Sequence, residues 1–199
     1  MIVAFTNYDP ASSLLEGFAR ELISLAGSRV SLILGPPADS VASNIQSSLA
    51  SVSAPFFFFG HGKSSPLAMV GQDQAHVIDS STHSLLADRL VYGACCYSVD
   101  ILTPAVSTHN TTVLGYKGKL MLPLLPAYEP LMKGCALAGA RSLLAGNTVQ
   151  DAHRDMQTEY DNVARRLIGG SIQDQVVAVR VFDKNARATT FAGDPLLKL

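Results

Sequence analysis

The chain has 199 residues, 48% of them hydrophobic and 16% charged, which is the composition of a folded globular protein rather than a disordered one. Its net charge is -1 and Lys and Arg form no cluster, which argues against binding to nucleic acid. No stretch is typical of a membrane-spanning helix and the first residues lack a basic signal-peptide start, so we expect a cytoplasmic protein with no membrane partner.

The first third of the chain alternates between strand and helix patterns. Residues 2–5 are expected to form a strand, and a turn at 7–10 leads into an amphipathic helix over 11–26. A second strand over 30–34 precedes a helix over 41–49. This alternation favours a parallel sheet with crossover helices.

Two short apolar runs follow, over 56–59 and 90–94. An apolar run of this length bounded by turn residues is typical of a strand that is buried on both faces. Between the two runs, residues 67–78 predict a β-hairpin beyond the sheet edge, and residues 82–88 predict a short helix.

Each of these two strands ends next to a reactive side chain. His61 follows the first run and Cys95 follows the second. Because α/β proteins place their chemistry at the carboxyl edge of the sheet, we expect this His and Cys to lie side by side. A thiol beside an imidazole is a nucleophile with a base.

The last half of the chain continues the alternation. Residues 97–108 are ambiguous, since Pro104 limits any helix there. The remaining expected elements are a strand over 111–116, a Gly- and Pro-rich loop over 115–125, a helix over 128–145, a long helix that starts at Thr148–Asp151 and ends at Gly169-Gly170, and a strand over 175–182. Together the elements predict one domain over residues 1–199, with about six mainly parallel strands and helices on both faces.

The three cysteines, Cys95, Cys96 and Cys135, do not form a disulfide framework, and a bridge between the adjacent pair would be strained. The Cys and His spacings match no common metal motif. We therefore expect reduced thiols and no metal.

The order of these motifs resembles the caspase-like cysteine peptidases of clan CD: a hydrophobic strand ending in His61-Gly62, then one ending in Ala94-Cys95. Within the clan the chain looks most similar to the gingipain-like and CHAT groups. Residues 191–196 resemble their closing Gly-Asp-Pro segment, and residues 146–152 resemble the start of their penultimate helix. The resemblance implies a three-layer caspase-like sandwich with a β-hairpin after the His strand.

Two features depart from caspases themselves. His61 and Cys95 are 34 residues apart (95 − 61), whereas caspases separate theirs by roughly 50. The caspase signature Gln-Ala-Cys-x-Gly is not met, because Gly93 replaces its Gln and Tyr97 replaces its Gly. These departures argue against caspase-type specificity for Asp, but not against the nucleophile.

The family resemblance implies a cysteine endopeptidase that needs no cofactor and acts on a protein or peptide substrate. Cys95 would be the nucleophile, His61 would move the proton, and the backbone N–H groups of Gly62 and Cys95 would form the oxyanion hole. We favour Cys95 over Cys96, whose side chain is expected to point to the other face. The small size of the chain suggests that a separate regulatory protein controls it.

The substrate-binding residues are less well defined. Asp9 and Asn7 follow the first strand, where the family places specificity residues, and Asp9 would either select Arg or Lys or merely form the turn before Pro10. Asp151 is a weaker candidate. Residues 115–125, with Lys117 and Lys119, either line the cleft or form a mobile surface loop.

Two alternative functions remain open. The same fold can serve as a catalytically inactive interaction module, a pseudopeptidase. A flavodoxin-like nucleotide binder is disfavoured, because no Gly-rich phosphate-binding motif follows the first strand.

Overall fold

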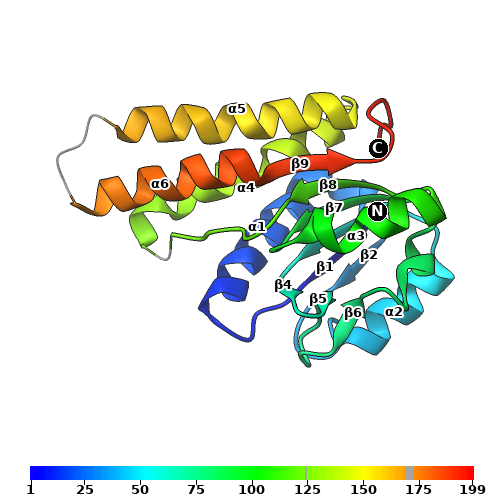
Figure 1. Cartoon of the computed structure of the whole chain (residues 1–199). Helices are drawn as coiled ribbons and strands as arrows, with labels where there is room; N and C mark the ends of the chain where they lie inside the picture. The colour runs from blue at the N-terminus through cyan, green and yellow to red at the C-terminus, as the bar shows by residue number, and fades with distance from the viewer. Residues whose placement is uncertain (124, 169–172) are drawn as a thin grey trace.

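The computed structural model describes residues 1–123, 125–168 and 173–199, with the backbone alone for 173–175. Its centre is a six-stranded sheet in the order β2-β1-β3-β7-β8-β9 (Figure 1). The strands are β1 (Ile2–Phe5), β2 (Leu32–Leu34), β3 (Phe56–Phe59), β7 (Leu90–Ala94), β8 (Thr112–Tyr116) and β9 (Thr189–Ala192). All neighbours pair in parallel except β9, which is antiparallel to β8. The expected mainly parallel sheet is therefore confirmed.

Helices cover both faces of the sheet, as the alternating pattern predicted. One face is packed by α1 (Pro10–Ala26), α4 (Glu129–Leu144), α5 (Val149–Leu167) and α6 (Gln173–Ala188). The other face is packed by α2 (Ala42–Ser51) and α3 (Ser98–His109). Short 3-10 turns lie at η1 (Gly27–Arg29) and η3 (Pro126–Tyr128).

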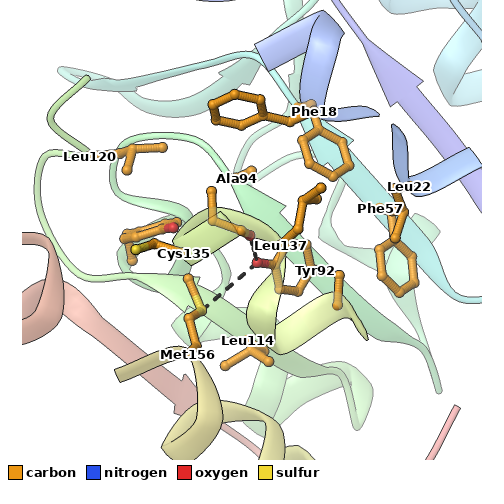
Figure 2. Packing of buried hydrophobic residues seen from close by; sticks show 14 of the residues in the cluster. Phe18, Leu22, Phe57, Tyr92, Ala94, Leu114, Leu120, Cys135, Leu137 and Met156 are labelled. Carbon is orange, nitrogen blue, oxygen red and sulfur yellow. Dashed lines mark hydrogen bonds between the residues drawn. The ribbon is translucent and has the colours of Figure 1, made fainter. Parts of the chain in front are cut away.

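The four phenylalanines of β3 show why this strand lies at the centre. Phe57 and Phe59 pack on the α1 and α4 side, Phe56 and Phe58 pack on the α2 and α3 side, and all four are fully buried. Burial of each such side chain contributes about 1.5–3 kcal/mol. Figure 2 shows Phe57 beside Tyr92 of β7, with ring centroids 5.5 Å apart. The phenylalanine rings on both faces of the sheet thus stabilise β3 in its central position.

The segment between β3 and β7 forms a second, smaller sheet. It contains β4 (His61–Ser64), β5 (Leu67–Val70) and β6 (His76–Ile78), all antiparallel. The expected hairpin over 67–78 is present as β5 and β6, and the residues directly after the His strand add a third strand to it. The 3-10 turn η2 (His83–Leu86) lies within the expected short helix.

The strand expected over 175–182 is wrong, because these residues belong to α6. The valines suggested a strand, but the buried positions Ala178, Val181 and Phe182 recur at helical spacing, whereas Val176 and Val177 are exposed. The last strand is β9, which follows this helix directly. The ambiguous residues 97–108 form α3, with Pro104 inside it. The expected helix stop at Gly169-Gly170 lies outside the described residues.

None of the helices in the described ranges has the length and hydrophobicity that crossing a lipid bilayer requires.

Candidate active site

Three segments meet at the carboxyl edge of the sheet, because β3 pairs with both β1 and β7. Residues 7–9 follow β1, residues 61–62 follow β3, and residues 95–97 follow β7. The side chains singled out in the sequence, apart from Asp151, therefore lie along one edge of the molecule.

His61 is held by Asp9. Its Nε2 lies 2.9 Å from Asp9 Oδ2, and its ring centroid is 5.2 Å from that of Tyr8. The Asp9 side chain is fixed in turn as the N-cap of α1, where its Oδ1 accepts hydrogen bonds from the Ser12 backbone N–H and hydroxyl, both at 2.8 Å. The start of α1 thus positions the Nε2 edge of the imidazole.

The charge state of Asp9 follows from these contacts. Partial burial by itself would raise its pKa, but hydrogen bonds from Ser12 and His61 outweigh burial and hold the pKa below its ordinary value. Asp9 is therefore ionised at neutral pH. As an acceptor only, it takes the Nε2–H of His61 and leaves Nδ1 as the ring nitrogen with a lone pair.

Asn7 has partners of its own beside this pair. Its backbone N–H donates to Gln72 Oε1 at 2.9 Å, the Gln72 amide donates back to Asn7 Oδ1 at 3.1 Å, and Asn7 Nδ2 donates to Glu16. Gln72 belongs to the turn between β5 and β6. The contacts tie the small sheet to the end of β1, so Asn7 supports the edge.

The two adjacent cysteines lie in different surroundings. Cys95 is fully buried, packed with α2 and α3, and burial raises its pKa well above the ordinary thiol value, with a further contribution from neighbouring Cys96. Cys96 is partly exposed and packs against the opposite core. Of the two, Cys96 is among the residues that line a pocket beside Gly62, and Cys95 is not.

The strand register, continued past the ends of β3 and β7, indicates which cysteine lies opposite His61. Phe59 of β3 pairs with Ala94 of β7. Continued by two residues, this register sets His61 opposite Cys96 and leaves Cys95 opposite Gly60. A hydrogen bond from the Gly60 N–H to the Ala94 carbonyl, 3.4 Å, agrees with that continuation.

Gly62 is in direct contact with the Cys96 backbone. A Cβ built on Gly62 would lie 1.8 Å from the Cys96 carbonyl oxygen, well inside any permitted contact. The position therefore accepts only glycine. The main chains after β3 and β7 touch at this point.

Ser98 fixes the turn that carries Cys96. Its fully buried hydroxyl donates to the Gly93 carbonyl at 2.9 Å and accepts from the Tyr116 backbone N–H at 2.8 Å, so it joins the start of α3 to β7 and β8. Tyr97, just before it, has a left-handed backbone with φ of 59°. The tight turn sends the Cys96 side chain away from the Cys95 core.

The Cys96 thiol is protonated in this arrangement. Burial raises its pKa, while the hydrogen bond between Sγ and the Leu120 carbonyl and the charge of Lys119 oppose the rise without cancelling it. The Sγ to Leu120 oxygen distance is 3.6 Å. Cys96 therefore needs a base to become a nucleophile.

A pocket of about 320 Å³ opens beside Cys96. It is lined by Gly62, Lys63, Ser64, Ser65, Cys96, Tyr97 and Lys119. His61 adjoins this pocket through Gly62 but is not part of its lining, and neither are Cys95 and Asp9. The structure thus brings Gly62 and Cys96 together in a cavity and pairs His61 with Asp9 next to it.

Asp151 lies at the other edge of the sheet. It caps the start of α5 with Thr148, and the adjacent Gln150 N–H donates to the Pro195 carbonyl. The C-terminal segment that contains Pro195 runs past Thr112, at the amino end of β8. Asp151 is not brought to the site.

Residues 1–123, 125–168 and 173–199 contain no group of three or more His, Cys, Asp or Glu side chains that could hold a metal ion. The reactive groups that the described residues bring to this edge include a thiol and an imidazole with its carboxylate, and Lys63 and Lys119 lie in the pocket lining.

Sequence reasoning missed two features of the site. It did not identify the pairing of Asp9 with His61, although an Asp-Pro dipeptide at a helix start is a recognisable cap. It also missed Ser98, for which only the Cys-Tyr-Ser spacing after a buried strand offered a signal. No family model matches the sequence, and no curated protein has a significantly similar sequence.

Proposed function

We propose that the chain is a cysteine peptidase with a caspase-like fold, in which Cys96 is the nucleophile and His61 moves the proton. The observation that carries the proposal is the placement of Cys96 and Gly62 in one pocket, at the carboxyl ends of two adjacent central strands, with the Asp9–His61 pair beside it. A nucleophile, an oriented base and backbone donors at one point are the elements of acyl transfer.

Cys96 takes the role that the sequence resemblance assigned to Cys95. The Cys95 thiol is fully buried among apolar side chains, where a substrate carbonyl has no access. Cys96 is partly exposed and lines the pocket, and the β3–β7 register, continued by two residues, sets it opposite His61. Accessibility and register therefore favour the same residue.

The reaction begins when His61 Nδ1 takes the proton of the Cys96 thiol as Sγ attacks the scissile carbonyl carbon. The tetrahedral oxyanion is stabilised by the Gly62 and Cys96 backbone N–H groups; one oxyanion-hole donor contributes roughly 3 kcal/mol in serine peptidases. The imidazolium then protonates the leaving amine, the C–N bond breaks and a thioester remains. Water, deprotonated by His61, attacks the thioester carbon, and the Cys96 thiolate leaves and regains its proton.

Asp9 serves this cycle as a positioning residue. Its carboxylate holds the Nε2–H of His61 throughout, so Nδ1 is presented to the thiol and the transient imidazolium is stabilised by an adjacent negative charge. Because the pKa of Asp9 is lowered, the carboxylate stays ionised while His61 gains and loses its proton.

The test is covalent labelling with a peptidyl acyloxymethyl ketone, followed by mass-spectrometric location of the adduct. We expect one adduct, on Cys96, that is absent in Cys96→Ala, retained in Cys95→Ala and at least about tenfold slower in His61→Ala. His76→Ala is the matched control, because His76 pairs with Asp79 away from the site. An adduct on Cys95, or equal labelling of all three cysteines, would contradict the proposal.

The second candidate is an inactive interaction module with the same fold. Two observations favour it: burial raises the pKa of all three cysteine thiols, and Cys96 is hydrogen-bonded to a backbone carbonyl. If this candidate is correct, no acyloxymethyl ketone adduct forms on Cys96 beyond the rate seen in His61→Ala.

A further inference from the structure

We infer that Tyr8 is a positioning residue of the site, whose aromatic ring fixes the plane of the His61 imidazole so that Nδ1 can reach the Cys96 thiol. The inference rests on the proposed peptidase function and deepens it. It is carried by the contact between the two rings, whose centroids lie 5.2 Å apart and whose planes are inclined by 31°. This separation is within the range of aromatic pairs that pack in an offset arrangement.

The contact with Asp9 is not sufficient to orient the imidazole. The Asp9 carboxylate lies 2.9 Å from Nε2 and so fixes the position of that nitrogen. The ring could still turn about the line that joins the two atoms, and the direction of the Nδ1 lone pair would change with it. The His61 side chain is 30% exposed, so its surroundings enclose it only in part. A second contact is therefore needed, and the Tyr8 ring supplies it.

The backbone on both sides of Tyr8 is held in place. Before it, the Asn7 backbone N–H and side-chain oxygen are hydrogen-bonded to Gln72, in the turn between β5 and β6, at 2.9 and 3.1 Å. After it, the Asp9 N–H donates to Ser12 Oγ at 3.0 Å in the capping box of α1. Because both neighbours are hydrogen-bonded to other elements, the Tyr8 ring has a defined position beside the imidazole.

The Tyr8 side chain contributes a ring and not a charge. Burial, and to a lesser degree the charge of Asp9, raises the pKa of Tyr8 to about 12, so the phenol is neutral at neutral pH. Removal of the hydroxyl alone should therefore leave the contact with His61 intact, whereas removal of the ring should abolish it.

The first measurement is peptide cleavage by Tyr8→Leu and Tyr8→Phe, with urea unfolding to verify that each variant is folded. We expect Tyr8→Leu to lower kcat about tenfold with KM changed less than about twofold, because the base loses its orientation while the substrate keeps its contacts. Tyr8→Phe, which keeps the ring, should stay within about twofold of the wild type. Phe191→Leu is the matched control, because it removes a ring 5.5 Å from that of His153, between β9 and α5.

The second measurement needs no peptide substrate. It follows the rate at which iodoacetamide alkylates Cys96, located by mass spectrometry, in Tyr8→Leu, His61→Ala and the double variant. If Tyr8 acts through His61, we expect Tyr8→Leu to slow alkylation about fivefold in the wild-type background and not at all in the His61→Ala background. A residue that only supported the fold would change the rate by the same factor in both backgrounds.

The outcomes separate this inference from the function on which it rests. If the wild type cleaves peptides but Tyr8→Leu matches it in kcat, or Tyr8→Phe is as impaired as Tyr8→Leu, the ring does not position His61 and the peptidase proposal stands. Equal slowing of alkylation in both backgrounds also overturns the inference. If no peptide is cleaved while alkylation follows the expected pattern, Tyr8 positions His61 for another reaction of the thiol, and the peptidase proposal is wrong.

Discussion

Asp9 has two tasks: it caps α1 and it holds His61. The carboxylate can do both because its two oxygens have different partners. Oδ1 accepts both hydrogen bonds from Ser12, and Oδ2 makes the shortest contact with His61. The two tasks can be separated by substitution, because capping needs only an acceptor while orientation of the imidazole benefits from the charge.

Asp9→Asn should leave stability nearly unchanged, because Asn and Asp are similar N-caps, but should lower kcat by roughly 100-fold as His61 loses its orientation. Steady-state kinetics as a function of pH and urea unfolding measure the two effects. Ser12→Ala is the matched control: it should cost about 1 kcal/mol of stability and retain most of the activity. Equal loss of activity in both variants would mean that Asp9 acts only through α1.

Gly62→Ala should abolish activity, by at least about 100-fold, because the new methyl group would displace the Cys96 carbonyl and the adjoining N–H donors. The comparison is Gly134→Ala in α4, where a Cβ meets no atom within 4 Å and the helix should gain about 0.5–1 kcal/mol. Peptide cleavage and thermal unfolding report on both variants. An active Gly62→Ala enzyme would contradict the close contact between the two main chains.

At the scale of elements, the segment over residues 118–121 contacts the Cys96 thiol through the Leu120 carbonyl and is hydrogen-bonded to the rest of the protein on two sides. The Tyr97 N–H donates to the Gly118 carbonyl at 2.5 Å. On the other side, the amide of Asn185 in α6 accepts from the Met121 N–H at 2.9 Å and donates to the Met121 carbonyl at 2.7 Å. Because Asn185 is fully buried, α6 sets the position of the Leu120 carbonyl over Cys96.

Asn185→Ala should destabilise the protein by about 2 kcal/mol, because backbone groups of Met121 lose their partners. It should also raise the rate at which iodoacetamide alkylates Cys96, since the Leu120 carbonyl is no longer held against the thiol. Urea unfolding and adduct mapping measure these changes. Unchanged alkylation would show that the segment over 118–121 keeps its position without the α6 contact.

The end of β6 depends on a second carboxylate. Asp79 accepts hydrogen bonds from the Ser81 hydroxyl and N–H and from His76, and these lower its pKa to about 2, against the opposing effect of burial. A lowered carboxylate pKa stabilises the fold above the unfolded-state value near 4 and loses that contribution as the pH falls toward 2.

Asp79→Asn should therefore lower the urea midpoint at pH 7, and the difference from the wild type should shrink between about pH 4 and pH 2. Asp161→Asn on α5 serves as a control outside the small sheet. A difference that stays constant across this pH range would show that the Asp79 charge does not stabilise the turn.

At the scale of the whole molecule, apolar patterning was sufficient to identify most of the fold. The runs over 56–59 and 90–94 are strands with those bounds. A short apolar run that is buried on both faces is typical of a central strand in a parallel sheet. The hydrophobic pattern gave a wrong prediction at 175–182. Valine favours a strand locally, but these residues form part of α6, whose helical spacing brings its apolar side chains into the core with α5 and the sheet. Tertiary burial outweighed local propensity there.

The site was predictable only in part. The motifs predicted that His61 and a cysteine follow adjacent strands. The distinction between Cys95 and Cys96 depends on the register between β3 and β7, which cannot be predicted from the sequence. The pocket beside Cys96 is lined by residues of β4 and by Lys119 after β8, which are far apart in the sequence. Contacts between segments so far apart in the chain become visible only in the folded molecule.

The most direct test of the account is the turnover of one peptide substrate by Cys95→Ala and Cys96→Ala, measured side by side with folding verified by circular dichroism. We predict that Cys96→Ala loses at least about 1,000-fold in kcat and that Cys95→Ala stays within a few fold of the wild type. Loss of turnover in Cys95→Ala with activity retained in Cys96→Ala would contradict the assignment of the nucleophile.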